Sequence, residues 1–274
     1  MILARFFDGK SCRLGEIIKE EILPIGAMDL LDYLEAEPPI PQGEKIPLNQ
    51  VELLLPLEEV GRVFCLGKNY LDHIRELSEL DGVDDTTPGA PIFFMKASKE
   101  ISQDGASLTS WQDHTKSLDY EVELVLVIGK KCKNLSKEQV EEVIFGYLIG
   151  NDFTARDLQT SHQQWLKGKS LDGFTALSSK VISRDELAFP PKLELRLFVN
   201  DELRQRGSTD DLLFDIPTLV SELSQGLTLY PGDLIFTGTP SGVGAGMKPP
   251  TYLKSGDRVR CEIEHLGSLT TFIK

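Results

Sequence analysis

Residues 118–129 read LDYEVELVLVIG, a run that is rich in β-branched and apolar side chains and ends at a glycine. This composition predicts a β-strand. Successive side chains of a strand point to opposite faces, so Asp119, Glu121 and Glu123 share one face. Both faces turn apolar toward the end of the run, which predicts a strand buried on both sides, with the acids at its open end. Same-face neighbours lie roughly 6.6 Å apart, and two carboxylates at that spacing repel unless a cation or a proton intervenes. From this run alone, a solvated strand end and a metal site are equally open.

The overall composition is that of a soluble globular protein. The chain has 274 residues with a net charge of −14, long enough for one large domain or two unequal ones. So acidic a chain is not expected to bind nucleic acid or anionic membranes. Its four cysteines form no CxxC pair, which argues against a disulfide framework and a structural zinc site. We find no signal peptide and no apolar stretch near the ~20 residues of a membrane helix, so a cytoplasmic protein is expected.

The chain divides into two expected units. Residues 1–56 are predicted to form a small N-terminal α+β unit, with strands at ILARFF and VELLLP, a helix at AMDLLDYLEA and a Pro-rich loop at EPPIPQGEKIP. Residues 57–274 are predicted to form the main domain. Its strands and short helices do not alternate regularly, which predicts an α+β fold with a mixed, curled sheet.

Several local patterns in the main domain predict particular elements. SKEQVEEVI predicts a helix with a capping box between Ser136 and Gln139. LELRLFVNDELRQRG predicts a hairpin that turns at residues 200–201. DIPTLVSELSQG predicts a helix capped by Asp215, and RDLQTSHQQWLKG predicts one helix closed by Gly168.

Three polar features do not fit a plain core. Asp152 follows an apolar run in GYLIGNDFTAR; it is either the N-cap of the next helix or a third oxygen ligand beside the two glutamates. Three carboxylates would suit Mg²⁺, Mn²⁺ or Ca²⁺, and the lack of a His or Cys cluster argues against zinc. His73 and Glu76 stand three residues apart in NYLDHIRE, so they form either a surface pair or a carboxylate-oriented imidazole. Lys169 in WLKGKSLDGF reads most simply as solvated.

The glycine-rich segment TGTPSGVGAG, residues 237–246, invites a nucleotide-binding interpretation. It contains neither GxGxxG nor GxxxxGK[ST], and the following KPPTYL does not predict a helix. We therefore expect a tight backbone loop that approaches a small ligand.

Taken together, the motifs resemble the fumarylacetoacetate hydrolase superfamily, in particular its branch of acylpyruvases and 2-hydroxyhepta-2,4-diene-1,7-dioate isomerases. The resemblance covers residues 60–274 and rests on an ordered set of strings: VFCLGKNYLDHIRE, LDYEVELVLVIGKKC, GYLIGNDFTARDLQ, WLKGKSLDGFTAL and LIFTGTPSGVG. It implies a curled β-roll fold, usually assembled as a homodimer, in which the first 56 residues match a variable part.

The resemblance also implies roles for individual residues. A divalent cation, Mg²⁺ or Mn²⁺ with Ca²⁺ as a substitute, would be held by Glu121, Glu123 and Asp152. Lys169 would lie close to it as a catalytic residue that adds positive charge beside the developing oxyanion. His73 and Glu76 would form a catalytic pair on a lid, which we expect to span residues 70–90. The substrate would be approached by Gln159, Gly238 and Thr239.

The resemblance implies an enzyme that acts on small keto acids, and the residues named above fit that chemistry. The leading hypothesis is a metal-dependent hydrolase that cleaves a C–C bond of an acylpyruvate-type β-dicarbonyl compound through an enolate. The alternative is an isomerase or decarboxylase of aromatic catabolism, acting on oxaloacetate or 2-hydroxyhepta-2,4-diene-1,7-dioate. A non-catalytic metal- or ligand-binding protein on the same fold is a third hypothesis, against which the presence of His73, Glu76 and Lys169 argues.

Overall fold

A computed structural model describes residues 1–35, 42–78, 86–109 and 111–274. Parts of the predicted loop at 37–47 and of the expected lid over residues 70–90 fall outside these residues. Among the described helices, none is long and apolar enough to cross a membrane.

One large mixed sheet organises the chain. Over the described residues it has thirteen strands, ten of them in the continuous order β4-β3-β2-β1-β15-β12-β11-β18-β6-β7. Its strands are β1 (Ile2–Phe7), β2 (Cys12–Ile18), β3 (Glu21–Pro24), β4 (Ile46–Pro47), β5 (Glu52–Leu54), β6 (Val63–Gly67), β7 (Ile92–Lys96), β8 (Ile101–Gln103), β11 (Val122–Ile128), β12 (Ile144–Asp152), β14 (Thr175–Leu177), β15 (Lys180–Ser183) and β18 (Leu234–Phe236).

A second sheet covers the middle of the first. Its five strands follow the order β17-β16-β19-β20-β9, and β16, β19 and β20 pack against β11 and β12. The predicted hairpin between β16 and β17 is confirmed, and Asn200 and Asp201 turn it with positive φ angles of 51° and 68°. The strands are β9 (Ser107–Leu108), β16 (Glu194–Val199), β17 (Glu202–Ser208), β19 (Arg258–Ile263) and β20 (Gly267–Ile273).

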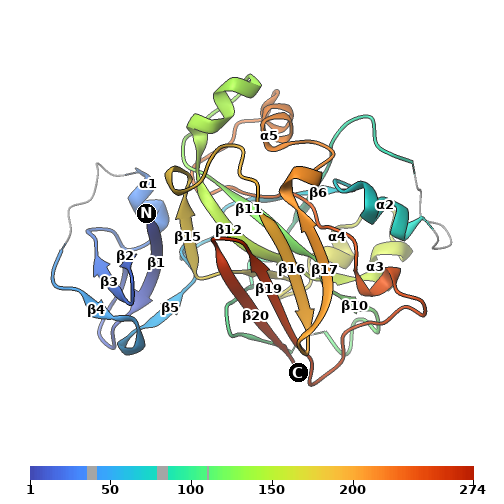
Figure 1. The fold of residues 1–274 in the computed structure, drawn as a ribbon, viewed down its shortest axis with the longest axis horizontal. Helices are drawn as coiled ribbons and strands as arrows, with labels where there is room; N and C mark the ends of the chain where they lie inside the picture. The colour runs from blue at the N-terminus through green and yellow to red at the C-terminus, as the bar shows by residue number, and fades with distance from the viewer. Residues whose placement is uncertain (36–41, 79–85, 110) are drawn as a thin grey trace.

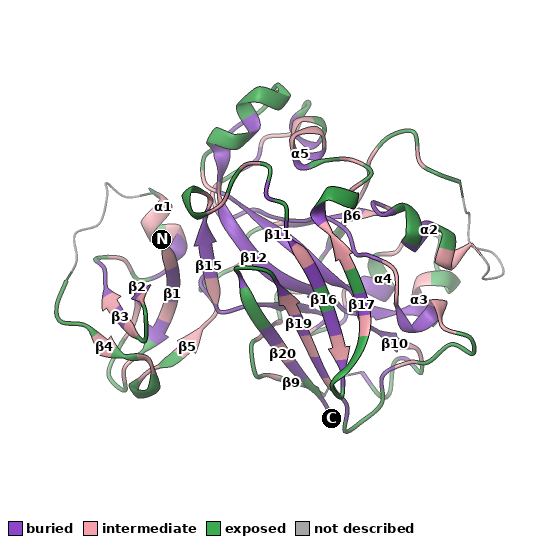
Figure 2. Cartoon of the chain, viewed as in Figure 1, coloured by how far each residue is buried: buried purple, intermediate pink, exposed green. Residues whose placement is uncertain are grey.

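The main hydrophobic core lies between the two sheets, where Figure 2 shows β11 buried along its whole length and β12 along most of it. Every residue of β11 is buried, as the apolar run on both of its faces predicts. The predicted α+β class with a mixed, curled sheet is confirmed: the strands dominate and the helices are short.

The helices lie at the edges of the sheets. In Figure 1, α2, α3 and α4 gather at the end of the molecule opposite the N-terminal strands. Their bounds are α1 (Leu30–Glu35), α2 (Leu71–Leu77), α3 (Arg156–Ser161), α4 (Leu166–Lys169) and α5 (Ile216–Ser224), and the 3₁₀ turns are η1 (Leu48–Gln50), η2 (Lys137–Val143), η3 (Arg184–Glu186), η4 (Thr209–Asp211) and η5 (Gly244–Gly246). The predicted caps are present: Ser136 and Gln139 form a capping box before η2, and Asp215 accepts from the Thr218 N–H at the start of α5.

The single helix predicted over residues 156–168 is wrong. The segment forms two helices, α3 and α4, because the hydroxyl of Thr160 and the ring of His162 bond to the carbonyls of Arg156 and Leu158 and end α3 early. Gly168 lies inside α4 instead of closing it. A Cβ there would stand 2.6 Å from the Gln159 nitrogen, so the glycine lets α3 and α4 pack closely.

The N-terminal strands extend the large sheet. β1 pairs with β15 of the main domain as well as with β2 and β5. These strands also surround a small hydrophobic cluster of their own around Phe6 and Ile22. Figure 1 shows this part, drawn in blue, projecting from one side of the molecule. The division of the chain between residues 56 and 57 stays a prediction.

Candidate active site

The acidic run that predicts a strand is interrupted in the structure. Residues 118–119 form the short strand β10 (Leu118–Asp119), which pairs with β13 (Thr154–Ala155), and β11 begins only at Val122. The break places the backbone of Glu121 between the Asn151 side chain and Asp152. The Glu121 N–H donates to Asn151 Oδ1 at 2.9 Å, and the Asp152 N–H donates to the Glu121 carbonyl at 2.9 Å.

Three carboxylates converge at this break. One oxygen each of Glu121, Glu123 and Asp152 lies within 4.8 Å of the others, and all three residues are at most 4% exposed. They approach because β11 and β12 pair antiparallel, with Glu123 opposite Gly150. A buried set of three hard oxygen donors fits a divalent cation such as Mg²⁺ or Mn²⁺. The residues thus meet the geometric expectation, while their role as ligands stays a prediction.

The charges of the three carboxylates are compensated unequally. Burial alone would raise the pKa of Glu121, but Lys169 and Arg156 lower it to about 2. Burial raises the pKa of Glu123 well above its ordinary value, and the negative charges of Asp152 and Glu121 raise it further. The Glu123 carboxylate accepts the Gly238 N–H at 2.6 Å. Among the described residues, no lysine, arginine or histidine forms an ion pair with it. Glu123 is therefore the carboxylate of the cluster whose negative charge is least compensated.

Two lysines reach the cluster from outside β11 and β12. Lys169 is 3% exposed, not solvated, and its Nζ donates to Glu121 at 2.6 Å and to Asp152 at 2.8 Å. Burial would lower the pKa of Lys169, but Asp152 and Glu121 hold it above its ordinary value. Lys96, at the end of β7, bonds to the other Asp152 oxygen and to the Lys169 carbonyl. Sequence reasoning missed Lys96; the available signal was a lysine that ends an otherwise apolar strand, PIFFMK.

Arg156 is a second residue that sequence reasoning missed. Its Nε donates to Asp119 at 2.8 Å, its Nη2 lies 2.8 Å from Glu121, and its Nη1 donates to Gln159 at 3.1 Å. Asp119 therefore pairs with Arg156 and does not join the cluster of Glu121, Glu123 and Asp152. The signal was present in the sequence, because Arg156 opens the RDLQ string that contains Gln159.

His73 and Glu76 face the cluster from α2. His73 is 6% exposed, and its Nδ1 lies 3.4 Å from the Glu76 carboxylate. Both oxygens of Glu76 also accept the Gly242 N–H, at 2.9 and 3.0 Å. The pair is therefore attached to the glycine-rich loop and is not on the open surface. Of the expected lid over residues 70–90, residues 79–85 lie outside the described part of the chain.

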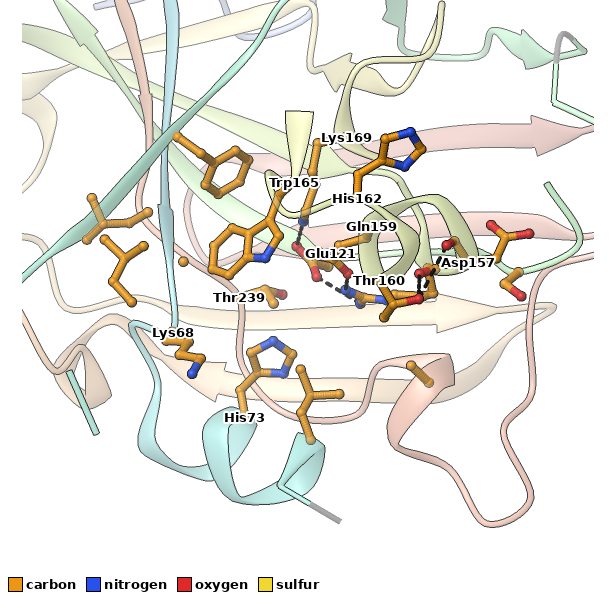
Figure 3. Close-up of a pocket in the computed structure, with 18 of the residues that line it drawn as sticks. Lys68, His73, Glu121, Asp157, Gln159, Thr160, His162, Trp165, Lys169 and Thr239 are labelled. Atoms are coloured by element: carbon orange, nitrogen blue, oxygen red, sulfur yellow. Dashed lines mark hydrogen bonds and ion pairs between the residues drawn. The ribbon is translucent and has the colours of Figure 1, made fainter. Parts of the chain in front are cut away.

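One cavity of about 640 Å³ contains most of the predicted site residues. Figure 3 shows Glu121 and Lys169 on one side of it, His73 on another, and Gln159, Thr239 and Trp165 around them. Glu123 and Arg156 also line it, whereas Asp152 lies behind Lys169 and Glu76 behind His73. Gly238 does not line the cavity; its N–H binds Glu123 instead.

Thr239 lines this cavity, but its hydroxyl is engaged inside the protein. The hydroxyl donates to the Val122 carbonyl at 2.9 Å and accepts from the Gln205 side chain at 2.8 Å. The loop of residues 237–246 thus approaches the cavity next to β11, and only the three-residue turn η5 follows within it. The substrate roles of Gln159, Gly238 and Thr239 stay predictions.

Comparisons with known proteins agree on one family. Residues 62–274 match the family model described as the C-terminal domain of fumarylacetoacetate hydrolase. An oxaloacetate tautomerase of Bacillus subtilis (strain 168) is 41% identical over 227 residues, which are 82% of this chain and 74% of that protein.

Two solved structures extend the similarity to the whole fold. A fumarylacetoacetate hydrolase from Exiguobacterium antarcticum is 36% identical with a TM-score of 0.88, covering 100% of this chain and 99% of its own. A 2-hydroxyhepta-2,4-diene-1,7-dioate isomerase from Mycobacterium marinum is 31% identical with a TM-score of 0.81, covering 100% and 98%.

Proposed function

The chain belongs to the fumarylacetoacetate hydrolase family of enzymes, and we propose that it interconverts the keto and enol forms of a small 2-oxo acid such as oxaloacetate. One observation carries this proposal: a His–Glu pair, a buried lysine and a carboxylate cluster share a single cavity. Such a site can hold a 2-oxo acid, move a proton and stabilise an enolate. The names of the relatives favour tautomerase or isomerase chemistry over the hydrolysis expected from the sequence.

In this proposal the cation site is built by Glu121, Glu123 and Asp152, and Mg²⁺ or Mn²⁺ suits their oxygens best. When bound, such a cation polarises the keto and carboxylate oxygens of the substrate. Lys169 would have to share Glu121 and Asp152 with it. The ammonium group would then turn an N–H toward the substrate oxygen that gains negative charge.

His73 is the proposed base. Its Nδ1 is engaged with Glu76, which leaves Nε2 to accept a proton from the carbon next to the keto group. Removal of that proton moves the electron pair into the C–C bond and onto the keto oxygen. The proton that His73 has accepted then returns to that oxygen, directly or through water, which completes the enol and restores the base, so the step consumes no other reactant. Arg156, already fixed by Asp119, keeps Gln159 and Glu121 in place along the cavity.

Hydrolysis of a β-dicarbonyl compound is the second candidate function, favoured by the similarity to a solved fumarylacetoacetate hydrolase. The same base would then take a proton from water, and the same enolate would leave when the C–C bond breaks. The two functions differ in their products, because tautomerisation keeps the substrate's carbon skeleton intact.

The test follows both products with the purified protein. After chelation and re-addition of Mg²⁺ or Mn²⁺, we expect faster decay of the enol absorbance of oxaloacetate while total oxaloacetate stays constant. Formation of pyruvate would instead identify a decarboxylase, and cleavage of acetylpyruvate a hydrolase. A role in aromatic catabolism and assembly as a homodimer stay hypotheses, the latter testable by light scattering.

A further inference from the structure

Asp119 is the one acid of the 118–129 run that stays outside the carboxylate cluster, although it is fully buried. Its two oxygens accept from four donors. Arg156 Nε lies at 2.8 Å, and the backbone N–H groups of Gly244, Ala245 and Tyr120 lie at 2.7, 2.9 and 2.9 Å. A carboxylate that accepts from this many donors holds the segments that supply them in one arrangement.

On one side, Asp119 reaches the cluster through Arg156. The same guanidinium that donates to Asp119 lies 2.8 Å from Glu121 and donates to Gln159 at 3.1 Å. Arg156 is 7% exposed and lines the cavity. Asp119 therefore determines which way the guanidinium edge faces along the cavity.

On the other side, Asp119 reaches α2 through residues 242–246, which we call the glycine loop. Asp119 binds the N–H groups of Gly244 and Ala245, and the Gly242 N–H binds both oxygens of Glu76. Glu76 is in turn the partner of His73. Gly246 leaves space for Glu76, since a Cβ there would overlap its side chain.

The approach between Asp119 and the glycine loop depends on the absence of a side chain. A Cβ on Gly244 would stand 2.7 Å from Asp119 Oδ1 and closer still to the Thr251 carbonyl. A residue other than glycine would therefore push the loop away from Asp119, and Glu76 with it.

We propose that Asp119 is a positioning residue that anchors the glycine loop to Arg156 and thereby sets where α2 holds His73. The inference rests on the proposed function only in taking His73 as the base. Without the carboxylate, two buried N–H groups of the loop, the Tyr120 N–H and one N–H of Arg156 would lack an acceptor, and the loop would move to satisfy its own two. A displacement of the base by about 1 Å is enough to lower turnover about 10²-fold.

The test is Asp119→Asn, which keeps the size of the side chain but turns one acceptor into a donor. We expect kcat to fall about 10²-fold, from the displacement of the base, with KM near its wild-type value. In hydrogen exchange followed by mass spectrometry, segments 71–77 and 242–247 should exchange faster, while 122–128 stays protected. Gly244→Ala should give the same pattern, because a side chain at residue 244 would push the glycine loop away from the Asp119 carboxylate.

Asp233→Asn is the matched control. Asp233 is also buried, and it also accepts from an arginine and a backbone N–H, Arg62 Nε at 3.1 Å and Tyr230 at 2.8 Å. It does not line the cavity. This variant should lower the melting temperature without changing kcat or the exchange of segment 71–77.

Asp119→Asn behaving like Asp233→Asn, less stable but with normal kcat and normal exchange in 71–77, would overturn the proposal. Should Asp119→Asn not fold, Gly244→Ala with wild-type kcat and exchange would do so. If the wild-type protein turns over no 2-oxo acid, the proposed function fails, and the exchange of segment 71–77 still decides this inference.

Discussion

The two sides of the cavity are built differently. On the strand side, Glu121, Glu123 and Asp152 are buried. Glu123 and Asp152 lie on β11 and β12, whose register is fixed by their pairing, and Glu121 lies at the break just before β11. On the α2 side, His73 stands on a helix of seven residues that has no side-chain N-cap. A helix that short does not persist without tertiary contacts. Its anchors among the described residues include the Glu76–Gly242 bonds and the bridge between Tyr70 and Leu212.

The difference separates stability from turnover. The strand side concentrates like charges in the core, so its residues affect the folded state through electrostatics whether or not a substrate is present. The α2 side holds the proposed base by a few contacts at the edge of the fold, so its residues matter chiefly for the reaction. Substitutions on the two sides should therefore have opposite signatures.

The largest effect is expected on the α2 side. His73→Ala should lower the rate of tautomerisation by about 10²–10⁴-fold, the usual contribution of a general base. The melting temperature and the affinity for Mn²⁺ should stay near wild type, since His73 contacts no carboxylate of the cluster within hydrogen-bonding distance among the described pairs.

His162→Ala is the control, because His162 also lines the cavity but has an exposed side chain bonded to the Leu158 carbonyl. It should keep most of the activity. If the His73→Ala protein tautomerises the substrate at a near wild-type rate, the α2 side takes no part in the reaction, and the proposed difference between the two sides is wrong.

Glu123→Gln should have the opposite signature on the strand side. It removes one oxygen charge from the proposed cation site, so the Kd for Mn²⁺ should rise roughly 10–100-fold. The metal-free protein should melt at a higher temperature, because the change relieves repulsion from Asp152 and Glu121. Each kcal/mol gained corresponds to roughly 2–4 °C in a chain of this size.

The pH dependence of the stability of the metal-free protein tests the same role of Glu123. Glu123 has a raised pKa in the fold, so above its ordinary value of 4.5 the unfolded chain releases a proton that the folded protein keeps. The metal-free wild type should therefore lose stability as pH rises from 4.5 toward the raised pKa. Glu123→Gln should lack this decline. Identical melting curves for the two proteins between pH 5 and 8, about the range where such a shift acts, would contradict the assignment.

A smaller effect is expected for Glu76→Gln. The amide can still accept the Gly242 N–H, so α2 should stay in place, but the negative charge beside His73 is lost. Replacing a charge-assisted hydrogen bond by a neutral one costs about 1–1.5 kcal/mol, or about tenfold in kcat. A loss as large as that of His73→Ala would mean that Glu76 itself takes part in proton transfer.

The sequence predicted the strand side better than its surroundings. Glu121 and Glu123 are separated by one residue in an apolar run, and the two-residue period of a strand puts them together. Asp152 joins them only through the pairing of β11 with β12, which no local pattern encodes. The residues alone left Asp152 as either an N-cap or a third ligand, and the family resemblance favoured the ligand. The break at residues 120–121 was not predictable either, because it depends on the Asn151 side chain and on the β10–β13 pair.

Lys96 and Arg156 were missed for a related reason. Each comes from a separate segment and becomes significant only when the fold brings its charge to the carboxylates. Lys169 looked solvated because a lysine after a helix usually is, and tertiary burial overrides that tendency. The helix predicted over 156–168 failed because side-chain bonds to carbonyls outweighed helical periodicity.

The smallest effect on turnover is expected for Thr239, which lines the cavity but uses its hydroxyl on the strand side. The hydroxyl bonds to the Val122 carbonyl and to Gln205, so it has no donor left for a substrate. Thr239→Val should therefore change KM by only about threefold or less, because the hydroxyl that it removes is not expected to bind the substrate. It should lower the melting temperature, since each unsatisfied buried group costs about 1–3 kcal/mol. Thr239→Ser keeps the hydroxyl and should resemble wild type in both measurements. A large rise in KM for Thr239→Val without a change in melting temperature would contradict this expectation. It would show that the hydroxyl turns away from Val122 and binds the substrate.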